Sequence, residues 1–128
     1  MIFVDTSIWV EALRRGESPE ARHLSALLDD GAVALAVPVR IEILAGASTR
    51  DRATLRRTLS ALPLFHPARS TWRLVESWLD RASAAGERFG FADLLIGAIA
   101  AEHEGELWSR DADFQRMARV GLVRLHTA

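Results

Sequence analysis

Hydrophobic residues fall into short blocks along the chain, and segments with helical spacing separate these blocks. The first block, residues 2–4, is a continuous apolar run, which is typical of a strand buried on both faces of a parallel sheet. Similar runs at residues 33–37, 107–109 and 122–125 predict further strands, and a weaker run at residues 64–66 predicts a short one. The pattern therefore predicts five strands spread over the whole chain.

The segments between these strands carry helix signals. Ser18 can cap a helix whose first position is Pro19, and Gly31 and Gly46 follow the predicted ends of two helices. The predicted helices cover residues 7–14, 19–30, 38–45, 51–62, 70–85, 91–103 and 113–119. Helices that alternate with strands favour an α/β fold, and we expect residues 1–128 to form a single domain, a three-layer α/β/α sandwich with a central, mostly parallel five-stranded sheet.

The composition narrows the chemistry. The sequence contains no cysteine, which excludes disulfide frameworks, thiolate nucleophiles and cysteine-based zinc sites, and leaves hard cations as the expected metals. All 16 basic residues are arginine, and the absence of lysine argues against phosphate loops, Schiff-base enzymes and haloacid-dehalogenase-like phosphatases. No apolar run is long enough to cross a bilayer and no signal peptide is recognisable, so we expect a cytoplasmic protein.

Four acidic residues occupy related places in this predicted topology. Asp5 ends the first strand, Glu42 lies near the start of the helix after the second, Asp93 lies in the first turn of a helix, and Asp111 follows the strand at residues 107–109. In a parallel α/β sheet these places share one edge, where ligands bind. We therefore expect the four carboxylates to converge.

A cation would relieve the repulsion within such a cluster. Like charges a few ångströms apart raise one another's pKa, and carboxylates without cysteine suit Mg²⁺ or Mn²⁺. Metal-assisted hydrolysis of a phosphodiester is the chemistry that this donor set favours, with water as the nucleophile and 5′-phosphate and 3′-hydroxyl ends as the products.

Each acid also has a structural interpretation. Asp5 can cap the following helix, Glu42 can complement a helix dipole, and either Asp111 or Asp113 can serve as a loop or cap residue. Asp93 is harder to explain in this way, because it interrupts an apolar series in which a buried charge without a partner is costly. The joint placement favours a functional site over these separate explanations.

Four segments resemble the PIN-domain family, and more specifically its VapC-type toxins of type II toxin–antitoxin systems. They are VDTSIW at residues 4–9, PVRIEILAG at 38–46, FADLLIGA at 91–98 and WSRDADF at 108–114. The order of these motifs and the chain length match from end to end, so the resemblance covers essentially the whole chain. It implies a PIN-like sandwich and a metal-dependent endoribonuclease.

The resemblance also implies roles for residues and partners. Asp5, Glu42, Asp93 and Asp111 would form the catalytic acidic pocket and hold Mg²⁺ or Mn²⁺, with Asp113 assisting beside them. Hydroxyls of Thr6, Ser7 and Ser109 would support the pocket, although helix capping explains the same residues. The family implies a homodimer, an RNA substrate and a cognate VapB-type antitoxin whose chain occupies the groove and the pocket.

Other features leave alternatives open. Arg50, Arg52, Arg56 and Arg57 form a basic helical segment that either contacts RNA phosphate or is simply a solvated face. Trp9 is a candidate to line the antitoxin groove. A housekeeping PIN nuclease for RNA processing and a non-catalytic PIN-like interaction module are the alternative functions.

Overall fold

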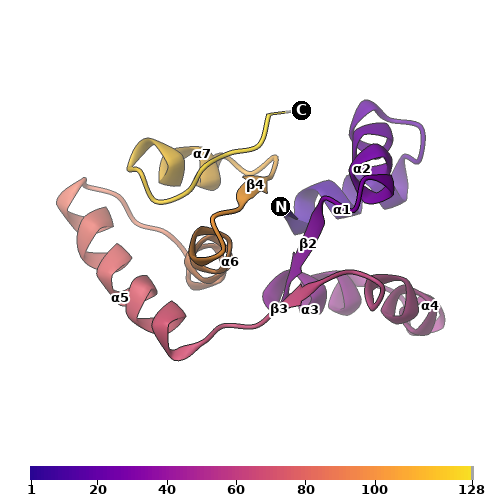
Figure 1. Cartoon of the computed structure of the whole chain (residues 1–128), viewed down its shortest axis with the longest axis horizontal. Coiled ribbons are helices and arrows are strands. Elements are labelled where there is room, and N and C mark those ends of the chain that lie inside the picture. Colours follow the sequence, from indigo (N-terminus) through magenta and orange to yellow (C-terminus); the bar gives the residue numbers. More distant parts are fainter. Residues whose placement is uncertain (128) are drawn as a thin grey trace.

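The computed structural model describes residues 1–127, and strands and helices alternate along them (Figure 1). The elements are β1 (Ile2–Val4), α1 (Thr6–Arg14), α2 (Pro19–Asp29), β2 (Val33–Ala36), α3 (Val37–Gly46), α4 (Thr49–Leu59), β3 (Leu64–Phe65), α5 (Arg69–Ala84), α6 (Phe91–Glu102), β4 (Glu106–Trp108) and α7 (Ala112–Arg119). Among residues 1–127, no helix combines the length and the apolar character needed to span a bilayer.

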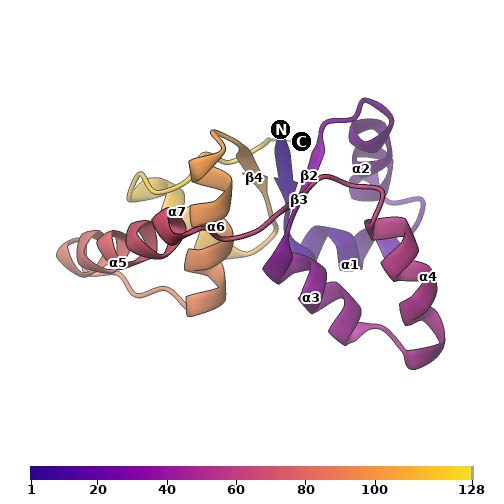
Figure 2. The same cartoon turned by 60° about the horizontal axis from the view of Figure 1, so that its bottom comes forward.

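The sheet has four strands in the order β3-β2-β1-β4, and every pairing is parallel. Figure 2 shows α1 to α4 on one side of this sheet and α5 to α7 on the other. The predicted α/β class and the three-layer arrangement are confirmed. All carboxyl ends of the strands consequently point to one edge, which is the edge expected to bind a ligand.

The prediction of a fifth strand at residues 122–125 is wrong. Leu122 and Val123 are buried, so the apolar run belongs to the core, but the segment meets β4 only through a single bridge between Leu107 and Leu125. Two hydrogen bonds support this bridge, from Leu107 N to Arg124 O at 2.8 Å and from His126 N to Leu107 O at 2.9 Å. An apolar run indicates that a segment is buried, but a buried segment need not pair with a strand, and this one lacks the ladder of hydrogen bonds that defines a strand.

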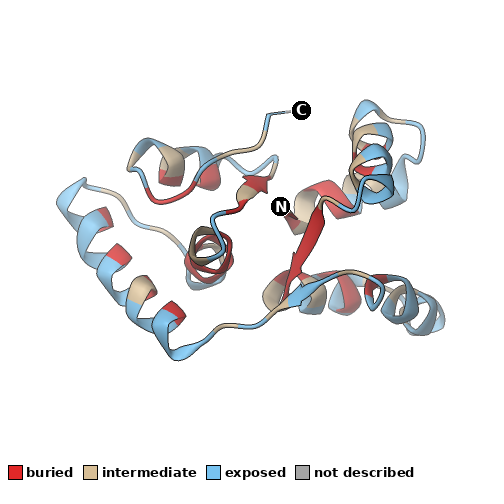
Figure 3. Cartoon of the chain, in the orientation of Figure 1, coloured by how far each residue is buried: buried red, intermediate tan, exposed pale blue. Residues whose placement is uncertain are grey.

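Helix α6 forms the centre of the core. Residues 94–100 of this helix are all buried, because the sheet covers one side and α5 packs on the other. Figure 3 shows this helix buried around its whole circumference, whereas α4 and α5 expose their outer faces. The continuous apolar sequence of α6 follows from this central position. It also means that Asp93, one residue before the buried run, lies where the core meets the edge of the sheet.

A pair of histidines holds the last part of the chain against α2. His23 Nε2 lies 2.9 Å from His126 Nε2, and the rings are nearly parallel with their centroids 5.2 Å apart, so they meet end to end. One nitrogen must donate and the other must accept in such a contact. His126 Nδ1 lies 3.0 Å from Glu106 Oε1, which connects the pair to β4.

Replacing Gly105 by Ala should destabilise the fold by about 2 kcal/mol, because an added methyl group overpacks a filled core. A Cβ at Gly105 would lie 2.6 Å from two ring atoms of the buried Phe3. Gly46→Ala is the matched control, since nothing lies within 4 Å of its Cβ position. Urea denaturation of both variants measures the difference, and equal stability of G105A and wild type would refute this packing.

Candidate active site

Asp5 is a buried carboxylate at the end of β1. Its backbone occupies the N-cap position of α1, but its side chain makes no capping hydrogen bond, so capping does not explain this residue. Instead, Oδ2 accepts hydrogen bonds from Ser109 Oγ at 2.7 Å and from Ser7 Oγ at 3.1 Å. Asp5 is only 6% exposed. A carboxylate this buried needs such donors, because desolvation of its charge is costly.

The two serines join Asp5 to the turn between β4 and α7. Ser109 Oγ accepts from Asp111 N at 3.0 Å, and Ser7 Oγ accepts from Arg110 N at 3.1 Å. The two hydroxyl oxygens lie 3.3 Å apart. This network fixes the backbone that carries Asp111 against the end of β1.

Asp111 caps a helix, which was the structural interpretation offered for either Asp111 or Asp113 from the sequence. Its Oδ1 accepts from Asp113 N at 2.9 Å at the start of α7. Capping uses one carboxylate oxygen and leaves the other available. Oxygen atoms of Asp93, Asp111 and Asp113 all lie within 4.8 Å of one another. Asp113, which was expected only to assist, is therefore one of the three aspartates that lie closest together in this group.

The pKa of Asp93 is raised by its surroundings. Partial burial and the nearby charges of Asp111, Asp5 and Asp113 raise the pKa of Asp93 from 3.8 to about 6. Asp5 is therefore close enough to act on Asp93 electrostatically, although it lies outside the tightest group of oxygens. Four aspartates from three parts of the chain meet at the predicted edge of the sheet.

Glu42 stands apart from these four. It is exposed on α3, and its Oε1 accepts a hydrogen bond from Thr6 Oγ1 at 2.7 Å. It also lines a groove of about 570 Å³ between α1, α3 and α4, together with Val10, Leu13 and Leu55. Glu42 thus lines this groove and is held by the hydroxyl of Thr6, the residue that follows Asp5.

The cluster fits a hard divalent cation on the chemistry of its donors. Three carboxylates whose oxygens lie within 4.8 Å of one another supply the ligand type that Mg²⁺ and Mn²⁺ prefer. The raised pKa of Asp93 is a second sign, because it reflects burial of this carboxyl first and then the negative charge of the neighbouring aspartates.

Two groups singled out in the sequence have other roles. Arg52 Nε donates to Leu44 O at 3.1 Å and its Nη2 donates to Ala47 O at 3.3 Å, so its guanidinium covers the end of α3. Arg52 is therefore hydrogen-bonded within the protein, whereas Arg56, one helical turn further along, is exposed to solvent. Trp9 is 6% exposed and belongs to the core, so the prediction that it lines the groove is wrong.

Sequence reasoning missed the charged contacts beside Asp113. Arg116 Nη2 donates to Asp113 Oδ1 at 2.6 Å, and Arg116 also pairs with Glu87 on the loop before α6. The spacing of Asp113 and Arg116, three residues apart on a helix, was the one available signal. The contribution of Glu87 had no signal in the sequence pattern.

Replacing Asp93 by Asn should stabilise the metal-free protein at neutral pH. With the folded pKa raised from 3.8 to about 6, the folded chain loses stability as the pH rises through this interval, and D93N escapes that loss. Allowing for solvent screening, we expect D93N to be about 1–2 kcal/mol more stable at pH 7 and equal near pH 4. Urea denaturation in EDTA at both pH values measures this, and a gain independent of pH would contradict the electrostatic cause.

Comparison with known proteins agrees with this geometry. A family model described as PIN domain matches residues 2–120. Ribonuclease VapC11 of Mycobacterium tuberculosis is 35% identical over 125 residues, which cover 94% of this chain and 93% of the relative.

Solved structures show the same fold at lower identity. VapBC2 from Rickettsia felis, bound to a DNA fragment from its promoter, superposes with a TM-score of 0.80 at 20% identity and covers 98% of both chains. VapBC-5 from Mycobacterium tuberculosis, a member of the VapBC family of toxin–antitoxin systems, reaches 0.69 at 21% identity over 98% of this chain and 97% of that chain. With a family match over nearly its whole length, the chain belongs to the PIN-domain family and, within it, to the VapC ribonucleases.

Proposed function

We propose that this chain is a metal-dependent endoribonuclease that acts as the toxin of a VapBC-type toxin–antitoxin system. The observation that carries the proposal is the meeting of Asp5, Asp93, Asp111 and Asp113 at one edge of the sheet. The ribonuclease names of the relatives support the activity, and the family match over residues 2–120 supports a single PIN domain.

Asp5, Asp93 and Asp111 are the proposed ligands of Mg²⁺ or Mn²⁺, with Asp113 assisting beside them and Glu42 as a further carboxylate at the rim. A bound divalent cation would stabilise developing charge on the phosphoryl oxygens and lower the pKa of water. Ser109 and Ser7 occupy Oδ2 of Asp5, which orients its other oxygen, and the cap on α7 does the same for Asp111. Thr6 holds the carboxylate of Glu42 in a similar way.

RNA is the proposed substrate, and exposed arginines on α4 are proposed to contact its phosphates. Arg50, Arg56 and Arg57 are exposed, whereas Arg52 is engaged at the end of α3. Phosphate contacts of this kind position a nucleic acid without selecting its sequence. The acidic cluster repels the RNA backbone unless a cation is present, so binding at the cluster and metal loading are coupled.

A VapB-type antitoxin is the proposed partner for the groove between α1, α3 and α4. Val10 and Leu13 expose apolar surface there, and Glu42 places a carboxylate at its border. Such a groove suits a segment with an apolar face. The groove adjoins the site, so one partner segment could cover both.

A homodimer is proposed through the outer face of α5 and the start of α6. Trp72 and Leu79 lie seven residues apart on α5, which places them on one face, and both are exposed. Phe91 is 65% exposed and stacks on Trp72 with ring centroids 6.0 Å apart. Large apolar side chains grouped in this way are typical of a protein interface.

Asp5→Asn should reduce RNA cleavage roughly 100-fold or more, because the variant loses a proposed metal ligand that the serines hold in place. The measurement is cleavage of a purified RNA pool at matched protein and Mn²⁺ concentrations. Asp29→Asn, an exposed aspartate at the end of α2, is the matched control and should cleave like wild type. Wild-type activity should stop in EDTA and return with Mg²⁺ or Mn²⁺; full activity of D5N, or turnover in excess EDTA, would refute the mechanism.

The cleaved RNA should carry 5′-phosphate and 3′-hydroxyl ends. Water attacking phosphorus opposite the ribose 3′-oxygen breaks the bond to that oxygen, whereas a base acting on the 2′-hydroxyl would give a 2′,3′-cyclic phosphate. His23 and His126 hydrogen-bond to each other, and His126 also bonds to Glu106, so this pair does not supply such a base at the cluster. Mass spectrometry of the fragments distinguishes the two outcomes, and cyclic phosphate as the primary product would overturn the proposed mechanism.

A further inference from the structure

Arg116 is the one cation that forms an ion pair with the acidic cluster among residues 1–127. It lies on α7, and its Nη2 donates to Asp113 Oδ1 at 2.6 Å. The other arginine next to the site, Arg110, pairs instead with Glu11 on α1 at 3.1 Å. The positive charge that the cluster receives from ion pairing therefore comes through Asp113.

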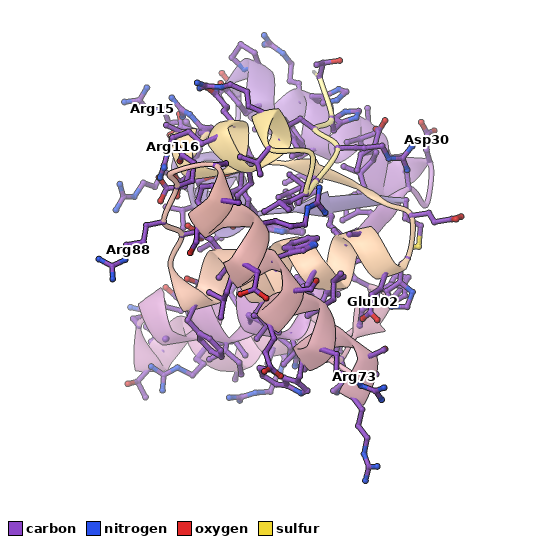
Figure 4. All side chains as sticks on the ribbon, turned by 90° about the vertical axis from the view of Figure 1, so that its left-hand side faces the viewer. Arg15, Asp30, Arg73, Arg88, Glu102 and Arg116 are labelled. Atoms are coloured by element: carbon purple, nitrogen blue, oxygen red, sulfur yellow. The ribbon has the colours of Figure 1, made fainter. Side chains whose placement is uncertain are left out.

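Contacts on three sides hold the guanidinium of Arg116 in place. Besides Asp113, it pairs with Glu87 and lies 5.0 Å over the ring of Phe89, both on the loop between α5 and α6. Figure 4 shows Arg116 beside this loop, whereas the neighbouring Arg88 extends away from the ribbon into solvent. Only a third of the Arg116 side chain is exposed. Because the planar guanidinium is pre-organised, Arg116 loses less side-chain entropy for each of these contacts than a more flexible cation would.

This position joins two elements that carry acids of the cluster. The loop that holds Glu87 and Phe89 leads directly into α6, whose first turn carries Asp93, while α7 carries Asp113 and Arg116 itself. Asp113 is also one of the residues that raise the pKa of Asp93 through its charge and a hydrogen bond. Arg116 thus offsets repulsion between carboxylates that lie on different elements.

The same charge opposes a metal ion. A positive group close to the ligands lowers the negative potential that attracts a divalent cation, so it stabilises the empty cluster and weakens the loaded one. Glu87 acts in the opposite sense, because it neutralises part of the charge of Arg116. An orienting role for Arg116 would instead predict that its removal weakens metal binding.

We propose that Arg116 is an internal counter-ion of the acidic cluster, which holds Asp93 and Asp113 together without metal and lowers the affinity for divalent cations, and that Glu87 limits this effect. The proposal rests on the metal site of the proposed function. It makes Arg116 and Glu87 positioning residues that act through Asp113 and do not touch the substrate.

The test compares R116Q, E87Q and R88Q with wild type. Isothermal titration with Mn²⁺ measures affinity, and thermal unfolding in EDTA measures the stability of the metal-free protein. R116Q should bind Mn²⁺ roughly three- to tenfold more tightly and melt at a lower temperature in EDTA. E87Q should bind Mn²⁺ more weakly than wild type, and R88Q, the matched exposed arginine, should leave both measurements unchanged.

The conservative variant R116K keeps the experiment decisive if R116Q folds poorly. Lysine retains the charge without the planar fork, so R116K should keep Mn²⁺ affinity close to that of wild type. The counter-ion proposal would be overturned if a folded R116Q bound Mn²⁺ no more tightly than wild type. It would also be overturned if R116K bound Mn²⁺ as tightly as R116Q and more tightly than wild type.

The outcome is separable from that of the proposed function. If wild type binds Mn²⁺ and the variants follow the expected order but no RNA is cleaved, the nuclease proposal fails and the counter-ion stands. If wild type cleaves RNA and R116Q binds Mn²⁺ like wild type, the counter-ion alone fails. A wild-type protein that binds no Mn²⁺ overturns both.

Discussion

The parallel register of β1 against β4 determines where the site forms. Val4 pairs with Trp108, and Asp5 N donates to Trp108 O at 2.9 Å, so both strands end at the same level. The residues that follow the two strands, Asp5 after β1 and Ser109 after β4, therefore lie beside each other, and Ser109 donates a hydrogen bond to Asp5. A slip of one residue would turn every side chain to the opposite face and separate this pair.

Burial and charge oppose each other at this edge. Asp5 is almost fully enclosed and depends on two serine hydroxyls, while Asp93 begins the helix whose next residues form the centre of the core. Carboxylates in such places cost stability that a purely structural site would avoid. The fold tolerates this cost because strand pairing and the packing of α6 hold the backbone independently of the acids.

The sequence pattern was sufficient for features that depend on local periodicity. Apolar runs located the four strands of the sheet, and the placement of Asp93 and Asp111 at element ends predicted that these two carboxylates lie close together. The same reasoning failed where an apolar run packs in the core without pairing, as at Leu122 and Val123, and it placed Trp9 on a groove although its ring is in the core.

Contacts made by long polar side chains were not predictable. Arg52 belongs to the same basic segment as the arginines that are proposed to contact RNA. Its guanidinium instead donates to backbone carbonyls at the end of α3. Glu87 meets Arg116 because of the path of a loop, which no periodicity encodes. Glu42 was expected beside the other acids, and its hydrogen bond with Thr6, the residue after Asp5, is a contact that the sequence pattern did not indicate.

The order in which the chain is synthesised gives the parallel sheet one more consequence. Asp5 leaves the ribosome before β4 and the turn that carries Asp111, because six helices and two strands lie between them in the sequence. Since β1 pairs with β4 across almost the whole sequence, a nascent chain has Asp5 and its neighbour Ser7 before it has Ser109, the second hydroxyl that orients the carboxylate. In a fold of this kind the acidic residues can come together only after β4 and the start of α7 have packed against β1.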